Sequence, residues 1–146
     1  MKSKIKLVLR ILLGAFLVYA GTGHLTWLRT EFLAQVPKWQ PLDPDFVVVA
    51  SGVVEILLGL SFLFLTRYKA QVGVAGALFF IAIFPGNINQ YVYQIDAFGL
   101  NTDTARLIRL FFQPVLVAWA LWCTGGWDYL KALWRRKGRK TAYFQA

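Results

Sequence analysis

Cysteine, histidine and charged residues are scarce in this chain, and each shortage excludes a class of function. Among 146 residues there are one cysteine, one histidine and only 16% charged residues. Cys123 alone can form neither an internal disulfide nor a Cys-x-x-Cys redox pair. One histidine and one cysteine are too few for the usual three or four ligands of a transition metal, so we predict no metal site.

The motifs of self-sufficient enzymes are missing as well. No serine stands in a recognisable nucleophile elbow, and there is no haem-binding histidine pair, flavin fingerprint or cysteine cluster. We therefore expect no covalently bound cofactor and no catalytic activity by this chain alone.

Long apolar runs are what the sequence has in abundance. Hydrophobic residues make up 58% of the chain and the mean hydropathy is +0.52, which is typical of a domain that faces lipid. Crossing a hydrocarbon core of ~30 Å takes about 20 apolar residues. Four runs are long enough and predict a single transmembrane domain over 1–146, an all-α, membrane-embedded antiparallel four-helix bundle: about 7–27, 46–66, 71–92 and 105–124.

The first run exceeds the apolar core of a cleavable signal peptide, so we interpret it as a retained helix, with cleavage after Ala20 as the alternative. Between the first two runs, 28–45 reads as an outer interfacial loop whose prolines break any regular helix. It ends at Asp43, a predicted N-cap. Pro85 should kink or unwind the third helix. A basic tail follows at 128–146.

The net charge of +9 is concentrated at one side of the predicted bundle. Cations gather in the N-terminal arm, in the turn at 67–69 and in the tail. The positive-inside bias then places both termini in the cytoplasm, which suggests a bacterial cytoplasmic (inner) membrane. The cations do not form a face interleaved with aromatics, so we expect membrane lipid as a partner and no nucleic acid.

Polar residues converge in the outer half of the predicted bundle. Glu55 lies nine residues into the second run, ~14 Å below its start. An ionised carboxylate unpaired in hydrocarbon costs at least ~2.5 kcal/mol, so Glu55 should be neutral or partnered. We predict Arg109 as its partner. The remaining members of this buried polar cluster, which we interpret as a ligand site or as a device fixing helix register, are His24, Asn87, Asn89, Arg106 and Gln113.

Short blocks in all four runs resemble the DoxX-like family of small four-helix membrane proteins. The similarity covers about 20–123 and rests on the order and spacing of five blocks: Ala20-Gly21-Thr22-Gly23-His24, Val36-Pro37, Ser51-Gly52-Val53-Val54-Glu55 with Leu58-Gly59-Leu60, Phe84-Pro85-Gly86-Asn87-Ile88-Asn89, and Arg109-Leu110-Phe111-Phe112-Gln113.

The resemblance implies a membrane protein tied to sulfur-compound oxidation with quinone as acceptor, to redox-stress assemblies or to receptor assembly. Three functions follow as hypotheses. The chain is a non-autonomous subunit of a redox or small-molecule pathway, which binds a quinone-like or small polar ligand and needs a membrane or soluble protein partner. Alternatively it is a scaffold or assembly factor, or a transporter of protons or small solutes.

Overall fold

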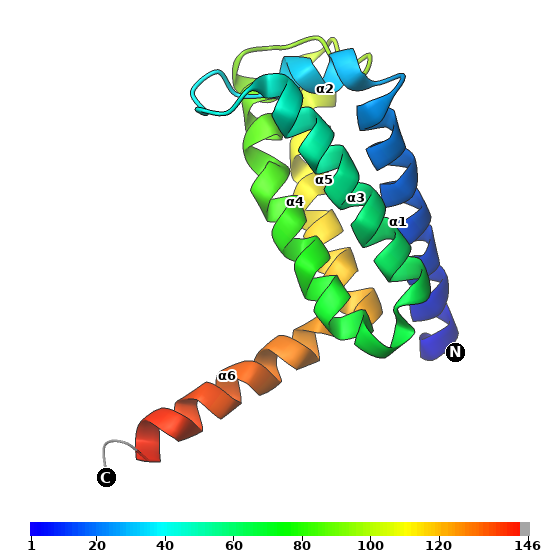
Figure 1. The fold of residues 1–146 in the computed structure, drawn as a ribbon, viewed down its shortest axis with the longest axis vertical. Coiled ribbons are helices and arrows are strands. Elements are labelled where there is room, and N and C mark those ends of the chain that lie inside the picture. Colours follow the sequence, from blue (N-terminus) through cyan, green and yellow to red (C-terminus); the bar gives the residue numbers. More distant parts are fainter. Residues whose placement is uncertain (144–146) are drawn as a thin grey trace.

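The computed structural model describes the backbone of residues 1–143 and the side-chain surroundings of residues 1–137. The regular secondary structure of this part is all helical (Figure 1), with the elements α1 (Lys2–Leu25), α2 (Arg29–Gln35), α3 (Pro44–Phe64), the short 3-10 turn η1 (Thr66–Tyr68), α4 (Lys69–Val92), α5 (Asp103–Thr124) and α6 (Gly126–Tyr143). Four of them, α1, α3, α4 with η1, and α5, are long and apolar enough to cross a membrane. The four predicted spans are confirmed, although α1 begins nearer the N-terminus than predicted.

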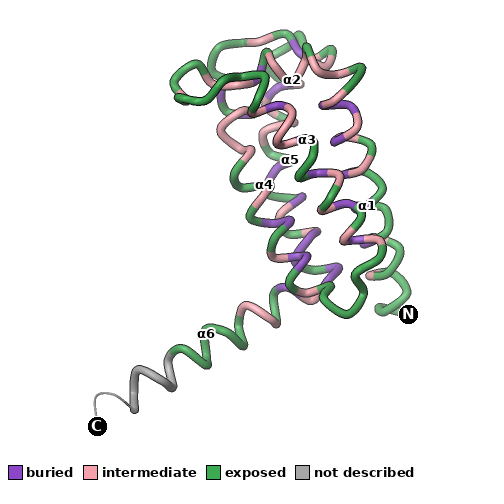
Figure 2. Tube along the Cα trace, in the orientation of Figure 1, coloured by how far each residue is buried: buried purple, intermediate pink, exposed green. Residues whose placement is uncertain are grey.

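The four long helices alternate in direction and form an antiparallel bundle (Figure 1). One end, here the α2 end, is covered by α2 and by the segment 93–102. The other end, here the α6 end, carries the start of α1, η1 and the start of α6. Figure 2 shows buried residues toward the inside of the bundle and exposed residues around it. Many of the exposed residues are large and apolar. That exposed apolar surface, together with the length of the helices, indicates an integral membrane protein.

Glycines bring α1 and α3 into close contact along their whole length. A Cβ atom on Gly21 would lie 2.6 Å from the carbonyl oxygen of Gly52, and one on Gly59 would lie 2.7 Å from the carbonyl oxygen of Gly14. Any larger side chain at these positions would push the backbones apart. The small residues of α1 therefore pack directly against α3.

The half of the bundle toward the α6 end is filled by apolar side chains, and we call it the closed half. Gly73 of α4 receives Thr124 of α5 there, because a Cβ atom on Gly73 would lie 1.8 Å from the Thr124 hydroxyl oxygen. The buried side chains of this core include Leu13, Leu17, Phe62, Val72, Ala77 and Ala120.

Caps fix the helix starts at the α2 end. The Asp43 carboxylate accepts a hydrogen bond from the Phe46 amide at 3.0 Å and Pro44 occupies the first turn, as predicted. At the start of α5 the Thr102 hydroxyl accepts from the Ala105 amide at 3.2 Å. These caps set where α3 and α5 leave the covering segments.

One sequence expectation is wrong. The loop at 28–45 contains α2, because its first proline comes only after that helix has ended at Gln35. Of the two outcomes predicted at Pro85, a kink or unwinding, unwinding does not occur: α4 continues through Pro85 to Val92, since a proline removes only one hydrogen bond from a helix that neighbours support. The basic tail, for which no secondary structure was predicted, is helical as far as Tyr143. Residues 144–146 of that tail, and the side chains of Arg139 and Lys140, lie outside the described part.

Candidate functional site

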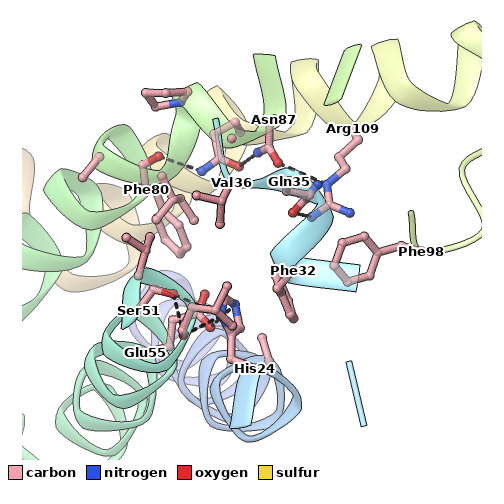
Figure 3. A pocket seen from close by; sticks show the side chains of 18 of the residues that line it. His24, Phe32, Gln35, Val36, Ser51, Glu55, Phe80, Asn87, Phe98 and Arg109 are labelled. Carbon is pink, nitrogen blue, oxygen red and sulfur yellow. Dashed lines mark hydrogen bonds and ion pairs between the residues drawn. The ribbon is translucent and has the colours of Figure 1, made fainter. Parts of the chain in front are cut away.

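A cavity of about 720 Å³ occupies the half of the bundle toward the α2 end, which we call the hollow half. All four long helices contribute to its wall, and α2 with the following residues 36–42 covers it. Two polar walls face each other across this cavity (Figure 3). One belongs to the α1–α3 pair and the other to α4 and α5.

The α1–α3 wall carries an imidazole beside a carboxyl group. His24 Nε2 lies 3.2 Å from Glu55 Oε2, and both side chains are buried. The other ring nitrogen, Nδ1, lies 3.2 Å from the Val48 carbonyl oxygen and 3.1 Å from the Ser51 hydroxyl oxygen. Because a carbonyl oxygen can only accept a hydrogen bond, we assign a proton to Nδ1. The other ring nitrogen, Nε2, is the one that faces Glu55.

Glu55 Oε2 is a buried acceptor that still lacks a hydrogen bond. The angles of its contact with His24 do not make one, and no other donor among the described residues reaches it. Buried acceptors in proteins are nearly always paired, so an oxygen of this kind marks a place for a further donor. Phe32 of α2 stacks on the His24 ring at 3.3 Å between centroids and fixes its plane.

The opposite wall is a chain of hydrogen bonds that starts from a guanidinium. Arg109 Nε donates to Asn87 Oδ1 at 3.2 Å, and Asn87 Nδ2 donates to Gln113 Oε1 at 2.8 Å. Gln113 Nε2 ends the chain on the Phe80 carbonyl oxygen at 2.7 Å. Arg109 Nη2 also donates to Gln35 Oε1 at 3.2 Å, and the guanidinium lies 4.2 Å over the Phe98 ring. The charge is thus held in a defined position.

The predicted partnership of Glu55 with Arg109 is wrong. Glu55 contacts His24, whereas Arg109 bonds to amides on the facing wall. Both side chains nevertheless line the same cavity (Figure 3). Glu55 and Arg109 do not meet because of how the helices are arranged side by side. The glycine contacts place α3 against α1, while α5 lies on the far side of the cavity.

Two of the seven predicted site residues do not line the cavity. Arg106 bonds to Asp96 and, at 2.8 Å, to Asp103, so it fastens the 93–102 segment. Asn89 Nδ2 donates to the Gln35 carbonyl oxygen at 3.3 Å and holds α2 in place. The other five line the cavity wall: His24, Glu55, Asn87, Arg109 and Gln113.

The prediction missed the contribution of α2. Gln35 is buried, accepts from Arg109 and donates to Gln90, while Phe32 stacks on His24. Both residues line the cavity and lie three positions apart, so that they share a face of α2. That spacing was the available signal, but a seven-residue helix is too short to reveal a period.

Apart from its two polar walls and the glutamines Gln35 and Gln40 of its cover, the cavity is mostly apolar. Aromatic and aliphatic side chains make up most of the remaining surface, among them Phe16, Tyr19, Trp39, Phe80 and Phe112. No group of three or more histidine, cysteine or acidic side chains able to hold a metal occurs among the described residues. The arrangement can place an apolar body between an acid–imidazole pair and a guanidinium.

Comparison with known proteins gives a family without an assigned activity. A family model described as a domain of unknown function (DUF8561) matches residues 13–124. The chain belongs to this family. The matched region includes all four candidate membrane spans except the start of α1. No curated protein and no solved structure matches the chain. On these findings the chain is a small helical membrane protein of unknown function.

Proposed function

We propose that this DUF8561 member is a DoxX-like subunit of a redox or small-molecule pathway and that its cavity binds a small molecule with two polar ends. The observation that carries the proposal is the pair of polar walls facing each other across the cavity (Figure 3). Most ligand sites are apolar with a few oriented polar groups, and this one fits that description.

A quinone-like ring is the ligand that suits these walls best. It carries two opposed oxygens on a flat apolar body. Arg109 supplies a donor for one oxygen, and the His24–Glu55 pair can hold a proton that is donated to the other. The rings of Phe32 and Phe80, which line the cavity, would contact its faces.

An apolar ligand could enter from the bilayer. Phe16 and Tyr19 of α1, and Ile108 and Phe112 of α5, are exposed on the bundle surface and also line the cavity. The cavity therefore reaches the lipid-facing surface between α1 and α5. Electrons would have to come from or go to a partner protein, which is why we propose a subunit.

The charge distribution supports an orientation with both termini in the cytoplasm of a bacterium, at its inner membrane. Of the seven acidic residues, only Asp128 belongs to the α6 end, where the lysines and arginines of the N-terminal arm, η1 and α6 lie. The positive-inside rule assigns such an end to the cytoplasmic side. The cavity would then open in the outer half of the membrane.

Mass spectrometry of lipid extracts tests the ligand. Purified wild-type protein should release a small molecule near one equivalent, and Glu55→Gln should release little while keeping its thermal unfolding temperature. Asp128→Asn makes the same chemical change at an exposed position of the α6 end and should retain the molecule. Titration with a short-chain ubiquinone should stabilise wild type and Asp128→Asn only. Equal behaviour of all three proteins would refute the proposal.

A scaffold role is the second candidate, because the His24–Glu55 contact joins α1 to α3 at the level of Gly21 and Gly52. If this contact serves only to fix helix register, His24→Leu and Glu55→Leu should each destabilise the bundle and the double variant should recover stability. Unfolding of the three variants in detergent measures this. A double variant as unstable as the singles would exclude the register role.

A further inference from the structure

The helix α6 leaves the bundle at a glycine hinge. Gly125 adopts a left-handed conformation with φ of 80°, which ends α5 and turns the chain sideways. From there α6 extends away from the bundle (Figure 1), and most of its described residues are exposed (Figure 2). Only its first residues pack near α4 and α5.

The exposed surface of α6 is two-sided. Trp127, Leu130 and Trp134 recur at helical spacing on one face, and the Trp134 side chain is 83% exposed. Lys131, one turn after Trp127, is exposed at the edge of this face, and Arg135 and Arg136 are exposed on other faces. A helix with large aromatic side chains on one face and cations on the other is suited to the boundary between lipid head groups and acyl chains.

A groove of about 310 Å³ runs down the lipid-facing side of α4 and α5 toward this helix. Pro114 and Ala118 are small and one turn apart on α5, so they leave a hollow there. Gln113 contributes the single polar side chain of the groove, and its amide is already bonded to Asn87 and Phe80. The complete lining is Phe80, Ile81, Phe84, Gln113, Pro114, Val117, Ala118, Leu121 and Trp127.

The groove and the cations lie next to each other. Trp127 lines the end of the groove nearest α6, and Lys131 follows one turn later on that helix. Asp128 is the one acidic residue of this end, so the local charge is strongly positive. Lysine and arginine side chains near an anionic leaflet are attracted to its head groups.

We propose that the α4–α5 groove and α6 together bind an anionic phospholipid. One acyl chain lies along the groove, and the phosphate-bearing head group lies at Lys131, Arg135 and Arg136. The site is at the opposite end of the bundle from the cavity proposed to bind a quinone-like ligand, so either proposal can fail without the other.

Lipid titration of the full chain in detergent tests the head group. Dioleoyl phosphatidylglycerol should remain bound as a one-to-one adduct in native mass spectrometry and should raise the unfolding temperature. Dioleoyl phosphatidylcholine, which has the same chains, should bind about tenfold more weakly. Glycerol phosphate alone should have no effect. Equal binding of the two lipids, or equal stabilisation by free glycerol phosphate, would overturn the proposal.

Two pairs of variants locate the site. The triple variant Lys131→Gln, Arg135→Gln, Arg136→Gln should weaken phosphatidylglycerol binding about tenfold or more. Its control, Lys2→Gln, Lys4→Gln, Lys69→Gln, removes the same charge from exposed positions of the same end. This control should bind as wild type does. Equal losses in both triple variants would mean general charge attraction and would refute the site.

The groove is tested by filling it. Ala118→Phe should abolish retention of phosphatidylglycerol, and Val115→Phe should not, because Val115 is exposed on the same helix but outside the groove. Retention by Ala118→Phe at the wild-type level would overturn the proposal. If Ala118→Phe does not fold, the triple variants alone test the proposal. The substituted side chains of α6 should not affect folding, because α6 extends away from the bundle.

Discussion

The two halves of this bundle are built from the same four helices and yet are packed in opposite ways. In the closed half, Gly73 and Gly76 let α4 approach Thr124 of α5 and Phe62 of α3, and apolar side chains fill the interior. In the hollow half, α4 presents Asn87 instead, and a cavity of about 720 Å³ remains. The closed half thus holds the helices together and leaves the hollow half free to carry polar groups.

The α1–α3 contact differs from the contacts between the two pairs. Gly14, Gly21, Gly52 and Gly59 keep α1 against α3 in both halves, so this pair does not open. The cavity forms only where α1 and α3 face α4 and α5. Ligand entry should therefore depend on the gap between α1 and α5 and not on the glycine contacts.

The largest effect on stability is expected from adding a methyl group to a glycine in the closed half. Gly73→Ala would place a Cβ atom 2.9 Å from the Ala120 backbone oxygen and much closer to the Thr124 side chain, so α4 and α5 must separate. We expect a loss of about 3 kcal/mol in unfolding free energy. Thermal or denaturant unfolding in one detergent measures it.

Gly86→Ala is the matched change in the hollow half. Its Cβ atom would meet nothing nearer than the Gln35 carbonyl oxygen at 3.6 Å, an ordinary contact. Replacing a glycine inside a helix should then stabilise by about 0.5 to 1 kcal/mol. Similar losses in both variants would contradict the contrast between the halves.

The depth of each polar residue in the bundle could be predicted from the sequence, but its neighbour could not. Helix spans and an antiparallel order place His24, Glu55 and Arg109 in the same half, as the structure has them. Which side chains touch depends on how the helices are arranged laterally. That arrangement is set by the contact of Gly21 with Gly52. Hydropathy does not reveal which helices are neighbours, because one apolar helix resembles another in its hydropathy.

Short and amphipathic helices were harder to predict than spans. α2 has seven residues, so it shows less than two full turns of periodicity. The tail at 128–146 has so many cations that its apolar positions are easily missed, although Trp127, Leu130 and Trp134 do follow helical spacing. Both elements turn out to border a cavity or a groove.

A moderate effect is expected from Arg109→Lys in the hollow half. Lysine keeps the positive charge but cannot donate to Asn87 and Gln35 at the same time in the fixed geometry of a guanidinium. We expect a loss of about 1 kcal/mol in stability and of at least about tenfold in affinity for a short-chain ubiquinone. Arg135→Lys is the control on exposed α6. Unchanged affinity in Arg109→Lys would show that only charge matters there.

The smallest effect is expected at the rim of the α2 end, where Arg29 bonds to Asp45. Arg29 Nε donates to Asp45 Oδ1 at 2.9 Å, and this hydrogen bond with the carboxylate raises the pKa of Arg29 above its usual value. A raised pKa means that the contribution of the Arg29–Asp45 pair to stability is complete at every pH below the pKa of Arg29 in the unfolded chain. It is lost only as the pH rises through the pKa of Arg29 in the folded chain. Because the pair is exposed, solvent screens it. Arg29→Gln should therefore leave the unfolding temperature unchanged between about pH 6 and pH 9, and a clear drop at any pH in that range would show that α2 depends on this contact to cover the cavity.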